Sequence, residues 1–282
     1  MTGEMQHYLP AALIGGFGIR RDGKELRKAK IVVRELASGL VHEANAEDVA
    51  WQPALYRLGN TATGVDPDIV DNLWKSIEGE LPPLVDRLDC CALVAEDDEK
   101  LIWYAATATV RHPRTFNDVV ADRAKRMGGT PPTADALQVL RVSTLQNHYR
   151  TMLGWRWRVL HGSDDLPRFV LNDRGWSLVG DPRQRVIGFW LPLGPRVGIL
   201  GYPDDARLPR KQPAFSEHQF LALSWAQWLN ATAFSDNKGT KQVFAHPSNE
   251  KILREAMPAA RVQVTTLGPF RGRGSSAETL FD

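Results

Sequence analysis

The feature that most constrains the fold of this chain is a change in hydrophobic pattern near residue 154. From about 66 to 153, apolar residues recur at helical spacing, as in Ile69, Leu73 and Ile77. From about 154 to 247, short apolar-aromatic runs are separated by Gly, Pro and Asp, a pattern typical of antiparallel strands. Helices and strands that are segregated along a chain predict an α+β fold rather than an alternating α/β fold.

A further pair of strands is expected before the helical region. Residues 31–33 and 40–41 are apolar and flank an Ala-Ser-Gly break at 37–39, which predicts a β-hairpin. We expect this hairpin and the C-terminal strands to form one antiparallel sheet on which the helical region packs.

Several residues mark expected helix ends. Thr133 is a good N-cap for the last helix of the middle region, and Pro82 and Pro83 are expected to end or kink the first one. Ser216 and Gln219 fit a capping box at the start of a later helix.

The domain organisation follows from length and composition. With 282 residues the chain is long enough to bury a full core. We expect residues 1–262 to form a single α+β domain. Residues 268–282 are polar and rich in Gly and Ser, and they predict a flexible C-terminal tail.

Charge and cysteine content bound the compartment and the partners. The formal charge of +2 is too small to predict a nucleic-acid partner by itself. No apolar run approaches the roughly 20 residues that span a bilayer, so no membrane partner is expected. The two cysteines, Cys90 and Cys91, are adjacent and do not suit a disulfide framework. These features predict a soluble, cytoplasmic protein.

Familiar catalytic signatures are absent from the sequence. There is no HExxH, CxxC or GxSxG motif, and the seven histidines are scattered, so we expect no metal and no cofactor. Gly16 and Gly18 follow a helical pattern rather than a strand, which is the wrong order for a dinucleotide loop.

One basic segment is a candidate nucleic-acid surface. Arg156 and Arg158 alternate with Trp155 and Trp157, so in a strand both arginines share one face. That face would suit phosphates. The alternative is that the tryptophans pack in the core while the arginines are solvated.

Five segments, taken in chain order, point to one family. They are "QHYLPAALIGGF" (6–17), "VRHP" (110–113), "WRVLHGSDDLPRFVLND" (157–173), "GFWLPLGPRVGILGYP" (188–203) and "LNATAFSDNKGTKQVFAHP" (229–247). The first resembles an opening HYVP motif, the second an R-x-P element, the third a segment ending in SDNP, and the fourth a PLSP strand pair. On these segments the chain resembles the Domain of Unknown Function 4238 family.

The chain also departs from that family's pattern. Where the family has SDNP, this sequence has Asn172, Asp173, Arg174 and Gly175, so the serine and the proline are both missing. Any role that this element retains therefore belongs to the carboxylate of Asp173.

The resemblance implies an intracellular α+β fold and a set of site residues, without a reaction. His7, as a proton shuttle, and Asp173, as its orienting carboxylate or an amine binder, are the catalytic candidates. The ligand-binding candidates are Tyr8, Arg111, Asn172 and Asn230. Among them, Arg111 would clamp a phosphate or carboxylate. Each of these residues also has a structural explanation, in helix capping, turns or satisfied hydrogen bonds.

Two classes of function remain open from the sequence, beside a third option, a metal-dependent enzyme, which would need two or three of the scattered histidines to meet with carboxylates in the fold. One is a polar ligand-binding cleft between the helical region and the C-terminal strands, in an enzyme that acts on a phosphate-bearing substrate such as RNA or tRNA. The alternative is a non-catalytic interaction protein, an accessory component of a bacterial defence or regulatory system.

Overall fold

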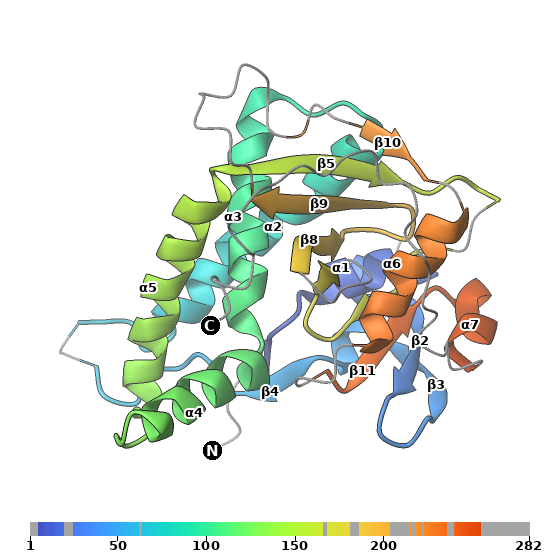
Figure 1. Ribbon diagram of the computed structural model, residues 1–282. Coiled ribbons are helices and arrows are strands. Elements are labelled where there is room, and N and C mark those ends of the chain that lie inside the picture. The colour runs from blue at the N-terminus through green and yellow to red at the C-terminus, as the bar shows by residue number, and fades with distance from the viewer. Residues whose placement is uncertain are drawn as a thin grey trace.

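The computed structural model describes residues 5–19, 25–61, 64–165, 168–180, 186–203, 215, 218–221, 223–235 and 240–254. The fold is α+β, as the sequence predicts. Its helices are α1 (Ala11–Gly16), α2 (Ile69–Asp89), α3 (Ala95–Arg111), α4 (Val119–Arg126), α5 (Ala134–Met152), α6 (Leu223–Ser235) and α7 (Glu250–Arg254). Figure 1 shows α2, α3 and α5 gathered on one side of the strands.

The strands form two larger sheets and one short pair. The five-stranded sheet has the order β10-β5-β9-β8-β7, with β5 (Trp155–His161), β7 (Ser177–Gly180), β8 (Val186–Pro192), β9 (Val197–Pro203) and β10 (His218–Phe220). The four-stranded sheet has the order β3-β2-β11-β6, with β2 (Lys30–Glu35), β3 (Val41–Asn45), β6 (Leu171–Asn172) and β11 (Gln242–Ala245). The pair is β1 (Met5–His7) with β4 (Trp51–Pro53).

The N-terminal hairpin does join later strands, because β11 pairs antiparallel with β2. The other C-terminal strands form the separate five-stranded sheet, so the strands are divided between two sheets rather than gathered in one. That second sheet is mixed, since β10 runs parallel to β5.

One helix prediction is narrowed by the structure and another is wrong. Of the two possibilities at Pro82 and Pro83, an end of the helix is excluded, because α2 continues to Asp89 with Leu84 and Leu88 buried in the core. Gln219 does not cap a helix: it lies in β10, and α6 begins at Leu223. Ser216 lies outside the described residues.

One buried apolar cluster contains side chains from the middle helices and from the five-stranded sheet, such as Trp74, Leu101, Leu145, Trp157 and Trp190. Among the described helices, none has the length and apolar character needed to cross a bilayer. The expected tail, 268–282, lies outside the described residues.

Candidate functional site

Three of the family-like motifs meet in space, each at the end of an element. His7 ends β1, Arg111 ends α3, and Asn172 ends β6. We refer to residues 7–8, 111–113 and 172–173 together as the motif junction. The His7–Tyr8 dipeptide lies against Arg111–His112, and His112 in turn lies against Asp173.

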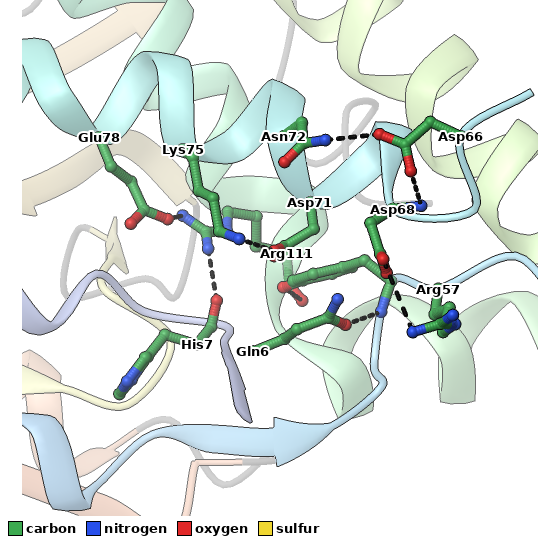
Figure 2. A network of polar contacts seen from close by, with 11 residues as sticks. Gln6, His7, Arg57, Asp66, Asp68, Asp71, Asn72, Lys75, Glu78 and Arg111 are labelled. Carbon is green, nitrogen blue, oxygen red and sulfur yellow. Dashed lines mark hydrogen bonds and ion pairs between the residues drawn. The ribbon is translucent and has the colours of Figure 1, made fainter. Parts of the chain in front are cut away.

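Arg111 is held on several sides. One guanidinium nitrogen pairs with the Glu78 carboxylate and another donates to the backbone carbonyl of His7, as Figure 2 shows. The Tyr56 and Trp74 rings lie under the guanidinium carbon at 5.8 and 5.7 Å. The side chain is 2% exposed, so its charge is buried but paired.

The surroundings of Arg111 are tied to the chain by further hydrogen bonds. The Tyr56 hydroxyl donates to the Arg111 carbonyl at 2.9 Å, and the Gln6 side-chain oxygen accepts from the Tyr56 amide at 2.6 Å. Burial alone would lower the pKa of Arg111, but the charge of Glu78 raises it above its ordinary value. This geometry commits Arg111 to the fold, and its expected role as an anion clamp stays a prediction.

The imidazole of His7 points away from Arg111 (Figure 2). Burial lowers the pKa of His7 below its ordinary value, and Arg111 adds to this effect, while Glu78 and a hydrogen bond to the Val49 backbone oppose it. Nδ1 of His7 has no hydrogen-bond partner among the described residues. The ring is therefore favoured in its neutral form.

Asp173 lies beside His112 rather than paired with His7. The distance from His112 Nε2 to Asp173 Oδ2 is 3.7 Å, and Asp173 Oδ2 also accepts from the Lys241 amide at 3.0 Å. Nδ1 of His112 accepts from the Thr115 amide at 3.3 Å, so the neutral ring carries its proton on Nε2, toward Asp173. The charges that act on His7 are those of Glu78, Arg111 and Arg27, so the geometry does not support Asp173 as the residue that orients His7.

The second oxygen of Asp173 is different. Asp173 is 1% exposed, and its Oδ1 has no hydrogen-bond partner within the described part of the chain. A buried carboxylate oxygen without a donor is costly, by several kcal/mol for a charged group in apolar surroundings. Asp173 Oδ1 is therefore a buried acceptor without a donor among the described residues; other junction atoms that lack a hydrogen-bond partner there include Nε of Arg111, whose charge is paired with Glu78, and the side-chain oxygen of Asn172.

Tyr8 completes this side of the junction. Its ring meets that of His112 edge to face, with the ring centroids 4.9 Å apart. Burial raises the pKa of the Tyr8 phenol well above its ordinary value, and the charge of Asp173 raises it further. Tyr8 is half-buried and remains a protonated phenol that can donate or accept.

The two asparagine candidates bind the backbone, although the side-chain oxygen of Asn172 has no hydrogen-bond partner among the described residues. The side-chain nitrogen of Asn172 donates to the Trp176 carbonyl at 3.1 Å, which closes the turn after β6. Asn230, on α6, accepts from the Val170 amide at 2.9 Å and donates to the Arg168 carbonyl at 3.0 Å. Both side chains brace the backbone near β6, and a ligand role for either stays a prediction.

Arg156 and Arg158 lie on the same side of β5, opposite the buried Trp155 and Trp157, as the alternation predicts. Arg156 is exposed, and the guanidinium of Arg158 lies 5.8 Å from the ring centre of Tyr202. Nucleic-acid binding by this face stays a prediction.

His112 is the site residue that sequence reasoning missed. It is the variable position of the R-x-P element, so the resemblance gave it no weight. Its position follows from the end of α3, where the backbone of His112 turns to an extended conformation (φ −67°, ψ 122°) before Pro113. The sequence signal that could have found it is Pro113 in "VRHP", because proline favours an extended backbone at the residue before it.

A pocket of about 200 Å³ lies elsewhere, between α1, α2 and the turn that joins β8 to β9. Its lining is mostly apolar, and its charged residues are Asp86, Asp89 and Arg196. The pocket thus lies between the helical region and the C-terminal strands, where the sequence predicts a cleft, but its lining is apolar rather than polar.

Comparisons with known proteins agree with the resemblance seen in the motifs. Searches of curated proteins and of solved structures return no match. A family model described as a protein of unknown function, DUF4238, matches residues 5–249. That range includes every segment of the motif junction, and the chain belongs to the DUF4238 family.

Proposed function

We propose that this protein binds a small polar ligand at the motif junction, and that Asp173 Oδ1 accepts a hydrogen bond from an amine or hydroxyl group of that ligand. Tyr8, beside Asp173, presents its phenol to the same ligand. His112 holds the other side of the carboxylate.

The observation that supports this proposal most strongly is the unequal pairing of the two Asp173 oxygens. Oδ2 accepts from the Lys241 amide at 3.0 Å, whereas Oδ1 has no partner among the described residues although Asp173 is 1% exposed. Folding does not leave a buried acceptor unpaired without a cost of about 1–3 kcal/mol or more. A ligand donor at Oδ1 removes that cost.

The chemistry of the junction favours donors over anions. The cation expected to clamp a phosphate, Arg111, is already paired with Glu78 and the His7 carbonyl. A phosphate placed at Asp173 would meet a like charge, which is unfavourable. The phosphate-bearing substrate that the sequence suggested therefore has less support here than an amine, a nucleoside or a polyol.

A thermal-shift panel tests this proposal. Wild type and Asp173→Asn are each titrated with primary amines, polyols and nucleosides, and with inorganic phosphate and citrate as anionic probes. The substitution keeps an oxygen for the Lys241 amide and replaces the unpaired oxygen with a donor group. A hydrogen bond to a charged group contributes about 1.5–3 kcal/mol, so Asp173→Asn should weaken binding by about 10- to 150-fold.

Asp71→Asn is the matched control, because Asp71 is also a buried carboxylate but pairs with Lys75 at 2.9 Å. It should leave ligand stabilisation unchanged. The proposal is wrong if anionic probes stabilise the wild type and Asp173→Asn equally, or if no donor-bearing probe stabilises the wild type.

A further inference from the structure

Three potential metal ligands from distant parts of the chain meet at one edge of the five-stranded sheet. Cys91 follows the end of α2, His161 ends β5, and His218 begins β10. The Cys91 sulfur lies 3.7 Å from His161 Nε2 and 3.4 Å from His218 Nδ1, and these two nitrogens are 2.9 Å apart. All three donor atoms therefore lie within 4.8 Å of one another, close enough to share one ion.

The sheet register brings the two histidines together. His218 pairs with Val159 in the parallel β10–β5 ladder, and Val159 is two residues before His161 on the same face. The two imidazole rings stack with their centroids 5.2 Å apart, and the Phe220 ring also stacks on His161, with a centroid distance of 5.1 Å. The fold therefore brings the two rings together before any ion binds, and the exposed His218 ring keeps room to adjust.

The backbone conformation of Cys91 is unusual for a residue other than glycine. The Ala92 amide donates to the Arg87 carbonyl and the Cys91 amide to the Leu88 carbonyl, which is the Schellman arrangement that ends many helices. Cys91 occupies the left-handed position of this motif, with φ +54°, where glycine is preferred. A strained non-glycine residue at such a site points to a role for its side chain.

The distances fit a tetrahedral metal with thiolate and imidazole ligands. With bonds of about 2.3 Å to sulfur and about 2.05 Å to nitrogen, tetrahedral zinc requires S···N separations of about 3.6 Å and an N···N separation of about 3.3 Å. The two observed S···N distances, 3.7 and 3.4 Å, bracket the first value. The N···N distance of 2.9 Å is shorter by about 0.4 Å, which a small rotation of the exposed His218 ring supplies.

The electrostatic surroundings favour a cation. Helix α2 is 21 residues long, and its C-terminal end, which carries negative partial charge, leads directly into Cys91. Asp89, the last residue of α2, adds a carboxylate two residues before Cys91. A thiolate at Cys91 would add further negative charge.

We propose that Cys91, His161 and His218 form a zinc-binding site. The ligand atoms select the ion: a thiolate and two imidazoles suit Zn²⁺, whereas Mg²⁺ and Ca²⁺ prefer oxygen ligands. Three protein ligands leave a fourth position for water or a ligand group, as in catalytic rather than structural zinc sites. The sequence hid the site because its ligands are separated by 70 and 57 residues, outside every short zinc motif.

The site lies next to the apolar pocket. Val197, in the lining, pairs directly with His161 in the sheet, and Asp89, also in the lining, is two residues before Cys91. The pocket and the proposed zinc site are therefore built on neighbouring parts of the same elements.

The test uses the full chain with any histidine tag removed, kept reduced. Zinc content after purification is measured by elemental analysis, and Zn²⁺ affinity by competition with a chromophoric chelator. Co²⁺ is then substituted for Zn²⁺, and the thiolate-to-cobalt charge-transfer band in the near ultraviolet is recorded. We expect about one zinc per chain and a charge-transfer band in the wild type.

Cys91→Gly is the decisive variant, because glycine relieves the left-handed backbone while it removes the sulfur. It should fold and lose the charge-transfer band, with zinc affinity at least about 100-fold weaker, since loss of outer-shell partners alone costs 10- to 100-fold. His218→Ala, at an exposed position, should weaken affinity similarly. Cys90→Ser is the matched control, because Cys90 is an exposed cysteine outside the cluster, and it should bind zinc like the wild type.

Two outcomes would overturn the proposal. One is a wild type that binds zinc no more tightly than Cys91→Gly, which would make the short nitrogen contact a hydrogen bond between the two rings. The other is equal loss of the cobalt band in Cys90→Ser and Cys91→Gly.

Discussion

Arg111 and Asp173 are the two buried charges of the motif junction, and they differ in how their polar atoms are paired. The Arg111 guanidinium pairs with Glu78 and the His7 carbonyl and lies near two aromatic rings, although its Nε has no hydrogen-bond partner among the described residues. Asp173 has partners at one carboxylate oxygen and none, among the described residues, at the other. Both residues belong to the same set of family-like motifs, so the motifs alone do not show which of them is structural and which binds a ligand.

This difference gives a criterion for separating structural residues from ligand-binding residues within the motif junction: the effect of a substitution on stability. Removing one member of a satisfied buried pair leaves its partner uncompensated, and this destabilises the fold. Replacing a buried carboxylate of which one oxygen lacks a donor relieves a desolvation cost and leaves stability nearly unchanged. Substitutions at Arg111 should therefore destabilise the fold far more than an amide substitution at Asp173.

The largest effect is expected at Arg111. Arg111→Ala should lower the free energy of unfolding by about 3 kcal/mol, at the low end for a buried pair because Glu78 remains partly exposed to water. Urea denaturation followed by tryptophan fluorescence measures this loss. Arg114→Ala, at an exposed position three residues away, should change stability by less than about 0.5 kcal/mol. Equal free energies of unfolding for Arg111→Ala and Arg114→Ala would contradict a structural role for Arg111.

A smaller loss is expected from the residue that supports Arg111. Tyr56→Phe removes the hydroxyl that donates to the Arg111 carbonyl at 2.9 Å and should cost about 1 kcal/mol. The same urea titration measures it. In the Arg111→Ala background the further cost of Tyr56→Phe should shrink, because the two residues share one network. Full additivity would show that Tyr56 acts independently of Arg111.

A pH-dependent effect sharpens the account of His7. Burial lowers the pKa of folded His7 below its ordinary value of 6.5, so the unfolded chain binds the extra proton more readily. The stability contributed by neutral His7 is present above pH 6.5 and is lost as the pH falls through the folded pKa. The stability difference between wild type and His7→Gln should therefore shrink on acidification from pH 7 to 5. A difference that grows toward low pH would contradict the buried, neutral ring.

The helices were the most predictable part of the fold, because their signals are local. Thr133 was expected to cap the long helix of the middle region, and its hydroxyl does accept from the Ala136 amide at 3.3 Å at the start of α5. Strand β10 could not be predicted in the same way. Gln219 lies in a stretch with helical spacing, and its strand conformation comes from pairing with Leu160, which is far away in the sequence.

The candidate site was predictable in its location but not in its pairing. The motifs named His7, Tyr8, Arg111 and Asp173, and these segments do meet. Which imidazole faces the carboxylate depends on how α3 ends, and only the extended backbone at His112 directs that ring toward Asp173. Pro113 favours that extended backbone, but the sequence does not show which distant carboxylate the His112 ring then meets.

The most direct measurement compares unfolding free energies of Asp173→Asn and Arg111→Met in the same buffer without added ligand. The account predicts that Asp173→Asn stays within about 1 kcal/mol of the wild type, because it keeps the bond from Lys241 and removes a charge with an unpaired oxygen. Arg111→Met should lose about 3 kcal/mol. A loss in Asp173→Asn as large as that in Arg111→Met would make Asp173 a structural residue and contradict the ligand site.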